Sequence, residues 1–166
     1  MQYINKAYLL TGGNVGNRFF YLSQAVNIIQ SLCGKVAAKS SLYETAPWGN
    51  TEQAAFLNQA LELHTSFAAE DLMNFLLLIE EKMGRKRLKR YEPRIIDIDI
   101  LLFNDEIINT FRLVVPHPEL PNRKFVLLPL SEIAGNHQHP VLHKTMNQLL
   151  IECPDRLAVN KVTEQP

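Results

Sequence analysis

The sequence predicts an α+β fold: a ferredoxin-like βαββαβ antiparallel sheet with both helices on one face and a C-terminal extension. Short runs rich in β-branched and aromatic residues alternate with two segments whose apolar side chains recur every three or four residues. The order of these segments is strand, helix, strand, strand, helix, strand, which is the order of that fold. The other face of the sheet would then be free for a ligand.

Composition and charge limit the possible classes of protein. The chain has 166 residues, of which 46% are hydrophobic and 20% charged, so we expect one domain over residues 1–166, with 136–166 as a peripheral C-terminal extension. Its net charge of zero argues against a general nucleic-acid binder. No segment approaches the roughly twenty apolar residues of a membrane span, and no signal-peptide pattern leads the chain. We therefore expect a cytoplasmic protein with no nucleic-acid or membrane partner, and a monomer.

A glycine-rich stretch separates the first strand from the first helix. Residues 7–11 predict a strand that stops at Gly12, Gly13 and Asn14. The glycines favour a tight strand-to-helix turn, with Asn14 or Asn17 as the helix cap. The apolar spacing of the helix continues to residue 33, and Gly34 ends it. The stretch lacks the ending of a P-loop and the spacing of a dinucleotide-binding loop.

The remaining elements follow from the same signals. Residues 36–45 and 56–63 predict two strands, separated by a loop that holds the only tryptophan, Trp48. Ser66 can cap a second helix that Gly84 closes. Beyond the strand at 93–103, residues 106–108 and 113–115 predict short strands and 126–133 an apolar segment. A helix near 146–151 and a loose tail complete the chain.

The stretch from Pro93 to Phe103 reads as a buried strand that carries two carboxylates. Seven of its eleven residues are large and apolar. Side chains alternate between faces of a strand, so Asp97 and Asp99 share one face and stand roughly 6–7 Å apart. Their oxygens can converge on one hard cation or on two. The same alternation also fits a strand with one polar face in solvent, and the flanking sequence has to decide between these readings.

A dense cationic segment lies immediately before this strand. Seven of the seventeen Lys and Arg residues fall between positions 82 and 94. Such a run is often a solvated face or a nucleic-acid contact. Its position beside Asp-x-Asp favours polyphosphate binding, because nucleotide–Mg²⁺ sites need both kinds of charge. His117, between two prolines and close to Arg112 and Arg123, is either structural or a further phosphate ligand.

The stretch Arg94–Leu101 resembles the signature of the 6-hydroxymethyl-7,8-dihydropterin pyrophosphokinases of folate biosynthesis. Further matches occur in the same order along residues 7–134, at 12–14, 43–49, 56–58, 84–87, 115–117 and 122–125. Several separated motifs in one order are far more specific than Asp-x-Asp alone.

The resemblance implies transfer of pyrophosphate from ATP, the co-substrate, to the pterin hydroxymethyl group, with release of AMP. It implies two Mg²⁺ ions on Asp97 and Asp99, and catalytic roles for these two residues with Arg85 and Arg94. It implies nucleotide contacts by Arg85, Arg87, Arg94, Ile100, Arg112, His117 and Arg123. It implies pterin contacts by Thr45, Ala46, Trp48, Phe56, Asn58, Tyr91 and Phe125.

The sequence departs from the family pattern at Ala46, Glu92 and Pro118, which concerns loop geometry more than chemistry.

Two other classes of protein remain as alternatives. A two-metal nucleotidyl transferase or nuclease would bind DNA or RNA with a steep salt dependence. A non-enzymatic ferredoxin-like binding module would show no Mg²⁺-dependent turnover.

Overall fold

The computed structural model describes residues 3–47, 52–86 and 92–163. Trp48, Arg87 and Tyr91, which the sequence assigns to substrate binding, lie outside these residues. The elements are β1 Asn5–Gly13, α1 Arg18–Leu32, β2 Lys35–Lys39, β3 Leu42–Thr45, β4 Phe56–Thr65, α2 Ala69–Lys82, β5 Asp97–Phe103, β6 Ile108–Asn109, β7 Val114–Val115, η1 Leu120–Asn122, α3 Lys124–Ala134, α4 Met146–Glu152 and β8 Val159–Val162.

The main sheet has six strands and is antiparallel wherever its pairs are described. Its order is β5-β1-β4-β3-β8, and β2 also pairs with β4. The central strands β1 and β4 are in register from Asn5 opposite Thr65 to Gly13 opposite Leu57. Because the strand region predicted at 36–45 pairs with β4 and β1 lies next to β5, the order agrees with the predicted ferredoxin-like sheet.

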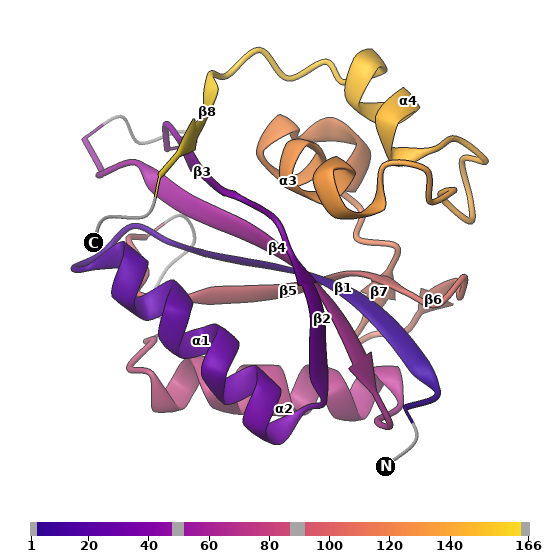
Figure 1. The fold of residues 1–166 in the computed structure, drawn as a ribbon, viewed down its shortest axis with the longest axis horizontal. Coiled ribbons are helices and arrows are strands. Elements are labelled where there is room, and N and C mark those ends of the chain that lie inside the picture. The colour runs from indigo at the N-terminus through magenta and orange to yellow at the C-terminus, as the bar shows by residue number, and fades with distance from the viewer. Residues whose placement is uncertain (1–2, 48–51, 87–91, 164–166) are drawn as a thin grey trace.

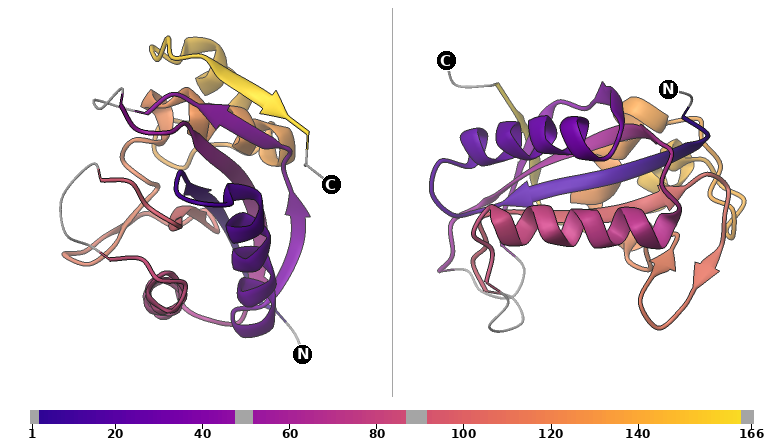
Figure 2. Two further views of the ribbon diagram at one scale, coloured as in Figure 1. Left: turned by 90° about the vertical axis from the view of Figure 1, so that its left-hand side faces the viewer. Right: turned by 90° about the horizontal axis from the view of Figure 1, so that it is seen from below.

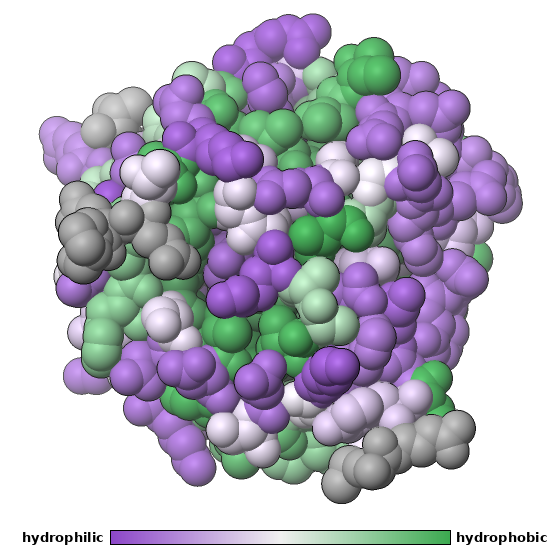
Figure 3. All heavy atoms as spheres, viewed as in Figure 1, coloured by the Kyte–Doolittle hydropathy of each residue, from purple (hydrophilic) through white to green (hydrophobic). Residues whose placement is uncertain are grey.

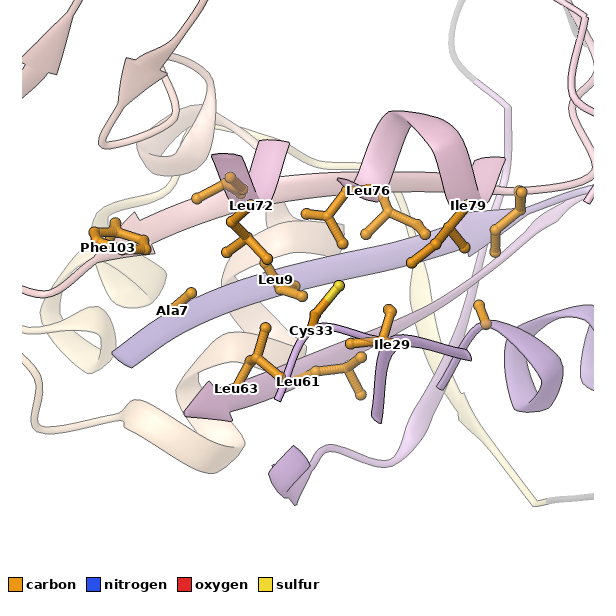
Figure 4. Close-up of a cluster of buried hydrophobic side chains, with 14 of the residues drawn as sticks. Ala7, Leu9, Ile29, Cys33, Leu61, Leu63, Leu72, Leu76, Ile79 and Phe103 are labelled. Atoms are coloured by element: carbon orange, nitrogen blue, oxygen red, sulfur yellow. The ribbon is translucent and has the colours of Figure 1, made fainter. Parts of the chain in front are cut away.

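Helices α1 and α2 cover one face of this sheet (Figure 1; Figure 2, right). Their buried side chains, among them Ile29, Leu72 and Ile79, meet those of β1 and β4 in one hydrophobic cluster (Figure 4). The three-to-four spacing of these residues puts them on a single side of each helix. Asn17 caps α1, its Oδ1 accepting from the N–H of Phe20, as one of the two expected caps.

The opposite face of the sheet is covered in part by α3 and α4, which lie on the other side from α1 and α2 (Figure 1). A second cluster joins Tyr8, Leu10 and Ala60 of the sheet to buried residues of these two helices. The expectation that this face is free for a ligand is therefore wrong for most of its area. A cavity that the start of α3 borders lies on this side of the sheet.

Three local predictions are also wrong. The segment 36–45 forms two strands because the chain leaves the ladder at Ser40 and Ser41, where the hydroxyl of Ser40 accepts from the N–H of Ala60. Ala68, not Ser66, occupies the N-cap position of helix α2, and no side chain makes a cap bond there. The expected loose tail contains β8, which extends the sheet by pairing with β3 (Figure 1).

The surface is mixed in character. In Figure 3, hydrophilic residues dominate the rim of the face shown, and hydrophobic residues gather toward its middle. In the part of the chain that the structure describes, none of the helices has the length and apolar character needed to cross a bilayer.

Candidate active site

Strand β5 begins with the two aspartates that the sequence singles out. Asp97 and Asp99 lie on one face, while Ile98 and Ile100 are buried on the other in the cluster under α1 and α2. The predicted alternation is thus confirmed. Asp99 is opposite Leu10, whose side chain belongs to the cluster under α3, so the aspartates are on the α3 side of the sheet.

Residues paired across β5, β1 and β4 extend this face from Asp97 across the sheet. Asp97 is opposite Gly12 of β1, and Gly12 is opposite Asn58 of β4. A Cβ on Gly12 would lie 2.3 Å from the Oδ1 of Asn58, and one on Gly13 would lie 2.3 Å from the backbone oxygen of Ile95. These glycines therefore lie in β1 and not in the turn that the sequence suggested. Their missing side chains leave room for Asn58 and for the segment that leads into β5.

Two cavities meet at the aspartates. The first, of about 410 Å³, is bordered by the ends of β1, β3 and β4 and by the start of α3. The second, of about 570 Å³, lies between α2, β5 and the segment around His117. Five charged residues border both cavities and are called the shared strip here: Arg85, Arg94, Asp97, Asp99 and Arg123.

Asp97 is held by two arginines of the shared strip. Its Oδ1 accepts from Arg85 at 2.5 Å and its Oδ2 from Arg94 at 2.7 Å. Burial alone would raise the pKa of Asp97, but the two guanidinium groups hold it below its usual value. Arg85 also contacts the carboxylate of Glu80 at 2.9 Å. The aspartate is therefore ionised at neutral pH and fully engaged with cations.

Asp99 has the opposite electrostatic character. Burial, followed by the negative charges of Asp97 and Glu80, raises its pKa to about 7. A second carboxylate beside Asp97 is thus half protonated near neutral pH in the absence of a further cation. A cation bound between the two aspartates would favour the ionised form of both.

His117 projects toward the second cavity from the loop after β7. Its backbone N–H donates to the oxygen of Leu101 at the free edge of β5, at 2.9 Å. Its Nδ1 accepts from the N–H of Glu119 at 3.2 Å. Burial and the charge of Arg123 lower its pKa, so the ring is neutral and carries its proton on Nε2. A single donor results on a residue that borders the second cavity.

The first cavity has polar atoms without partners. The Oγ1 of Thr45 and the Nδ2 of Asn58 are buried, and neither has a hydrogen-bond partner among the described residues. Buried polar groups are almost always paired in proteins, so these two are suited to a ligand that supplies the missing partners. Phe56 and Phe125 border the same cavity. The guanidinium carbon of Arg94 lies 5.7 Å from the centre of the Phe56 ring, and that of Arg123 lies 5.8 Å from the centre of the Phe125 ring.

Asn14 ties three segments around this cavity together. Its side-chain oxygen accepts from the N–H of Arg94 at 2.9 Å, and its Nδ2 donates to Gln53 and to the backbone oxygen of Ala54, both at 3.1 Å. Its backbone N–H donates to the oxygen of Arg94. Asn14 therefore connects the loop before β4 to the segment before β5 that contains Arg94. The sequence suggested Asn14 only as a possible helix cap, so this role was missed.

The predicted site residues that the structure describes all border one of the cavities. Those assigned to the pterin, namely Thr45, Ala46, Phe56, Asn58 and Phe125, line the first cavity. Those assigned to the nucleotide alone, namely Ile100, Arg112 and His117, line the second. Arg85, Arg94, Asp97, Asp99 and Arg123 stand between the two groups.

The sequence reasoning missed Glu80. This glutamate is 2% exposed, and besides its contact with Arg85 it accepts from the backbone N–H of Ile98 at 2.7 Å. It is four residues after Leu76 on the inward side of α2, and a charged residue at an inward position was the signal that could have revealed it. Gln53, which also borders the first cavity, gave no such signal.

The donor set around the aspartates suits magnesium. Mg²⁺ is usually bound by one or two carboxylates, several waters and the phosphates of a substrate. Asp97 and Asp99 offer those carboxylates on one face of β5. Within residues 3–47, 52–86 and 92–163, no cluster of three or more His, Cys, Asp or Glu side chains could form a complete protein cage for a metal. Waters or the phosphates of a substrate would supply the remaining ligands of an ion held by Asp97 and Asp99.

The sequence decides which family this site belongs to. A model of the family 7,8-dihydro-6-hydroxymethylpterin-pyrophosphokinase matches residues 8–135. The chain belongs to this family. The resemblance of the Arg94–Leu101 stretch is thus confirmed over most of the chain.

Curated relatives carry the same enzyme name. The 2-amino-4-hydroxy-6-hydroxymethyldihydropteridine pyrophosphokinase of Bacillus subtilis is 47% identical over 130 residues, which cover 78% of each chain. The enzyme of that name from Aquifex aeolicus is 39% identical over 141 residues, covering 85% of this chain and 88% of its own. The folic acid synthesis protein FOL1 of Dictyostelium discoideum is 38% identical over 98% of this chain. The match covers only 24% of that longer protein.

A solved structure supports the fold. The crystal structure of Plasmodium falciparum HPPK-DHPS with pteroate matches with a TM-score of 0.76 at 20% identity, over 92% of this chain and 43% of that one. At this identity the match concerns the fold alone, and it confirms the arrangement of sheet and helices.

Proposed function

We propose that the first cavity binds the pterin, the second binds ATP, and the shared strip promotes the transfer between them. As a member of its family, the protein transfers pyrophosphate from ATP to the hydroxymethyl group of 6-hydroxymethyl-7,8-dihydropterin in folate biosynthesis. The observation that carries the assignment of residues is the shared strip itself, since three arginines and two aspartates border both cavities.

The contents of the first cavity suit a pterin. A flat heterocycle with amide-like edges needs aromatic faces and a few fixed polar groups. Phe56 and Phe125 supply rings, while Thr45 Oγ1 and Asn58 Nδ2 supply polar atoms that have no other described partner. Ala46 borders the same cavity. A ligand that pairs with these two atoms removes an existing cost of burial, which favours its binding over that of an apolar ring.

The second cavity suits the nucleotide. Arg112 and His117 border it together with the shared strip, so its lining carries several cationic or donor groups. Ile100 lies on the free edge of β5, between Ile98, whose N–H donates to Glu80, and Leu101, whose oxygen accepts from His117. Backbone groups at such an edge can bind the rim of a base, and the arginines can bind phosphates along the chain.

Asp97 and Asp99 would hold Mg²⁺, two ions in our proposal. When bound, Mg²⁺ neutralises charge on the phosphates and helps to orient the attacking hydroxyl. The carboxylates are available only if Asp97 exchanges partners, because both of its oxygens contact arginines here. Phosphate groups can take over Arg85 and Arg94, since both guanidinium groups already border the second cavity.

The protein's own contribution is then position and charge. Arg85, Arg94 and Arg123 fix the phosphates beside the pterin, and the neutral His117 donates from Nε2 without adding charge. None of these groups has to form a covalent bond with the substrate. An exchange of Arg–Asp pairs for Arg–phosphate pairs conserves most of the charge contacts of the strip, so substrate binding leaves no arginine unpaired.

Separation of nucleotide products tests this function. The purified protein is incubated with ATP, Mg²⁺ and the pterin alcohol, and AMP, ADP and ATP are quantified. We expect AMP and the pterin diphosphate in equal amounts, with none formed when Mg²⁺ is chelated. Formation of ADP without AMP would indicate an ordinary kinase. No turnover, together with tight and salt-sensitive binding to DNA or RNA, would favour a nucleic-acid enzyme.

A further inference from the structure

A buried carboxylate of the C-terminal segment reaches the start of α3. Asp155 follows α4, lies beyond the family match at 8–135 and is 8% exposed. Its Oδ2 accepts from the backbone N–H of Lys124 at 3.0 Å, and its Oδ1 accepts from the N–H of Leu157 at 2.9 Å. The two bonds fix the carboxylate between its own turn and the helix.

Asp155 serves α3 as a cap supplied from a distant part of the chain. Lys124 is the first residue of α3, and Arg123 at the cap position makes no side-chain cap bond. The first N–H groups of a helix lack partners inside the helix, and a carboxylate there is favoured by the hydrogen bond and by the helix dipole. Asp155 thus satisfies the first N–H group of α3.

That first turn is one wall of the first cavity. The residues on either side of Lys124 are Arg123 and Phe125, and both border the cavity. The guanidinium of Arg123 lies 5.8 Å from the centre of the Phe125 ring. A shift of the first turn of α3 would therefore move an aromatic face and a cation of the site together.

The residues after Asp155 reach a second wall of the first cavity. Strand β8 pairs with β3, with Val159 opposite Thr45 and Val162 opposite Leu42 (Figure 1). Thr45 is the last residue of β3 and carries one of the unpartnered polar atoms of the cavity. Residues 155–162 therefore contact both the α3 wall and the β3 wall.

We propose that residues 155–162 form a brace that sets the separation of these two walls, and that Asp155 is a positioning residue for pterin binding. This inference rests on the proposed binding of the pterin in the first cavity. Asp155 touches neither substrate, and it acts through the backbone of Lys124 on Phe125 and Arg123. The brace lies outside residues 8–135, the region that the family model matches.

Calorimetric titration of the pterin alcohol, with a saturating non-hydrolysable ATP analogue and Mg²⁺ present, tests the proposal. For Asp155→Ala we expect affinity for the pterin to fall about five- to tenfold, which corresponds to the free energy that a lost helix cap typically costs. The loss of affinity for the ATP analogue should be smaller. Asp155→Asn keeps one oxygen for Lys124 and should bind within about twofold of the unaltered protein. Glu152→Ala removes a neighbouring acid whose partner, Lys144, is exposed, and is the matched control.

The outcomes separate the brace from a merely structural role. Thermal melting accompanies each titration. If Asp155→Ala melts at a lower temperature but binds the pterin as before, or if the Asn variant loses as much affinity as the Ala variant, the proposal is overturned. If the unaltered protein binds no pterin, the proposed function itself fails, and the brace with it.

Strand β8 provides a second pair of variants if Asp155→Ala does not fold. Consecutive strand residues point their N–H groups in opposite directions, so Val159→Pro or Asn160→Pro removes a bond to β3, and the other is its control. We expect one of the two to weaken pterin binding at least about threefold and the other to have little effect. If both variants bind the pterin with the affinity of the unaltered protein, the proposal of a brace is overturned.

Discussion

The two sides of the site differ in how their polar groups are satisfied. In the shared strip, which we propose binds the phosphates of the nucleotide, the charges are already paired with one another, as Arg85 and Arg94 hold both oxygens of Asp97. On the proposed pterin side, Thr45 and Asn58 present buried polar atoms that have no partner among the described residues. One side must exchange contacts when its substrate arrives, and the other gains contacts that were missing.

This difference predicts different kinetic roles. Groups that exchange partners during the reaction should affect the rate of the chemical step, because their charge contacts are remade around the reacting phosphates. Groups that only complete the contacts of a bound heterocycle should affect its affinity. Substitutions on the two sides are therefore expected to alter different kinetic constants.

The largest effect is expected from the aspartates. Asp97→Ala and Asp99→Ala should each reduce kcat by at least about a thousandfold, because each removes a carboxylate from the proposed magnesium site. Circular dichroism and thermal melting check that the fold is retained. Asp105→Ala, at an exposed turn after β5, is the control. Near-normal turnover in both variants would disprove the assignment of the metal site.

A smaller but still large effect is expected from the arginines. Arg94→Ala should lower kcat by about a hundredfold or more, because its guanidinium lies in a partly desolvated strip and contacts Asp97 at 2.7 Å. Lys86→Ala should change kcat by less than about threefold, because Lys86 is exposed. Steady-state assays at saturating ATP and pterin measure both. Equal losses would show that only total charge matters in this segment.

The smallest effect concerns stability and pH in the absence of Mg²⁺. Folding raises the pKa of Asp99 to about 7, so between about pH 4 and 7 the folded state binds more protons at this site than the unfolded state. The free energy of unfolding contributed by Asp99 therefore falls as pH rises through this window. Asp99→Asn should melt on the order of 5 °C above the unaltered protein at pH 8, and close to it at pH 4.

Thermal melting in a chelating buffer across this range measures the difference. A gap that grows toward low pH would have the wrong sign and would show that folding lowers the pKa of Asp99. Addition of Mg²⁺ with an ATP analogue at pH 8 should stabilise the unaltered protein more than Asp99→Asn, because ligands that bind only the folded state raise its stability.

Local rules predicted the parts of the site that local sequence determines. The two-residue period of a strand put Asp97 and Asp99 on one face, and the element order predicted the sheet. The motifs of the family named residues that the structure brings to the two cavities. These features depend on alternation and on order, which can be read along the chain.

The errors arose where contacts distant in sequence decide the structure. Strand β8 is short, none of its four residues is fully buried, and it pairs with the edge of β3, more than a hundred residues earlier. Asn14 was read as a local cap, but it bonds to Gln53, Ala54 and Arg94. Asp155 likewise gave no local signal, because its partner is the first turn of α3.

A comparison of two variants tests the division between the sides of the site most directly. Steady-state kinetics are measured for Asn58→Ala and Arg94→Ala over full ranges of both substrates, with the exposed Asn27→Ala as the control. We expect Asn58→Ala to raise the pterin KM about tenfold with little change in kcat, and Arg94→Ala to lower kcat with a smaller change in the pterin KM. If Asn58→Ala lowers kcat as much as Arg94→Ala and leaves the pterin KM unaltered, the two sides do not have separate roles.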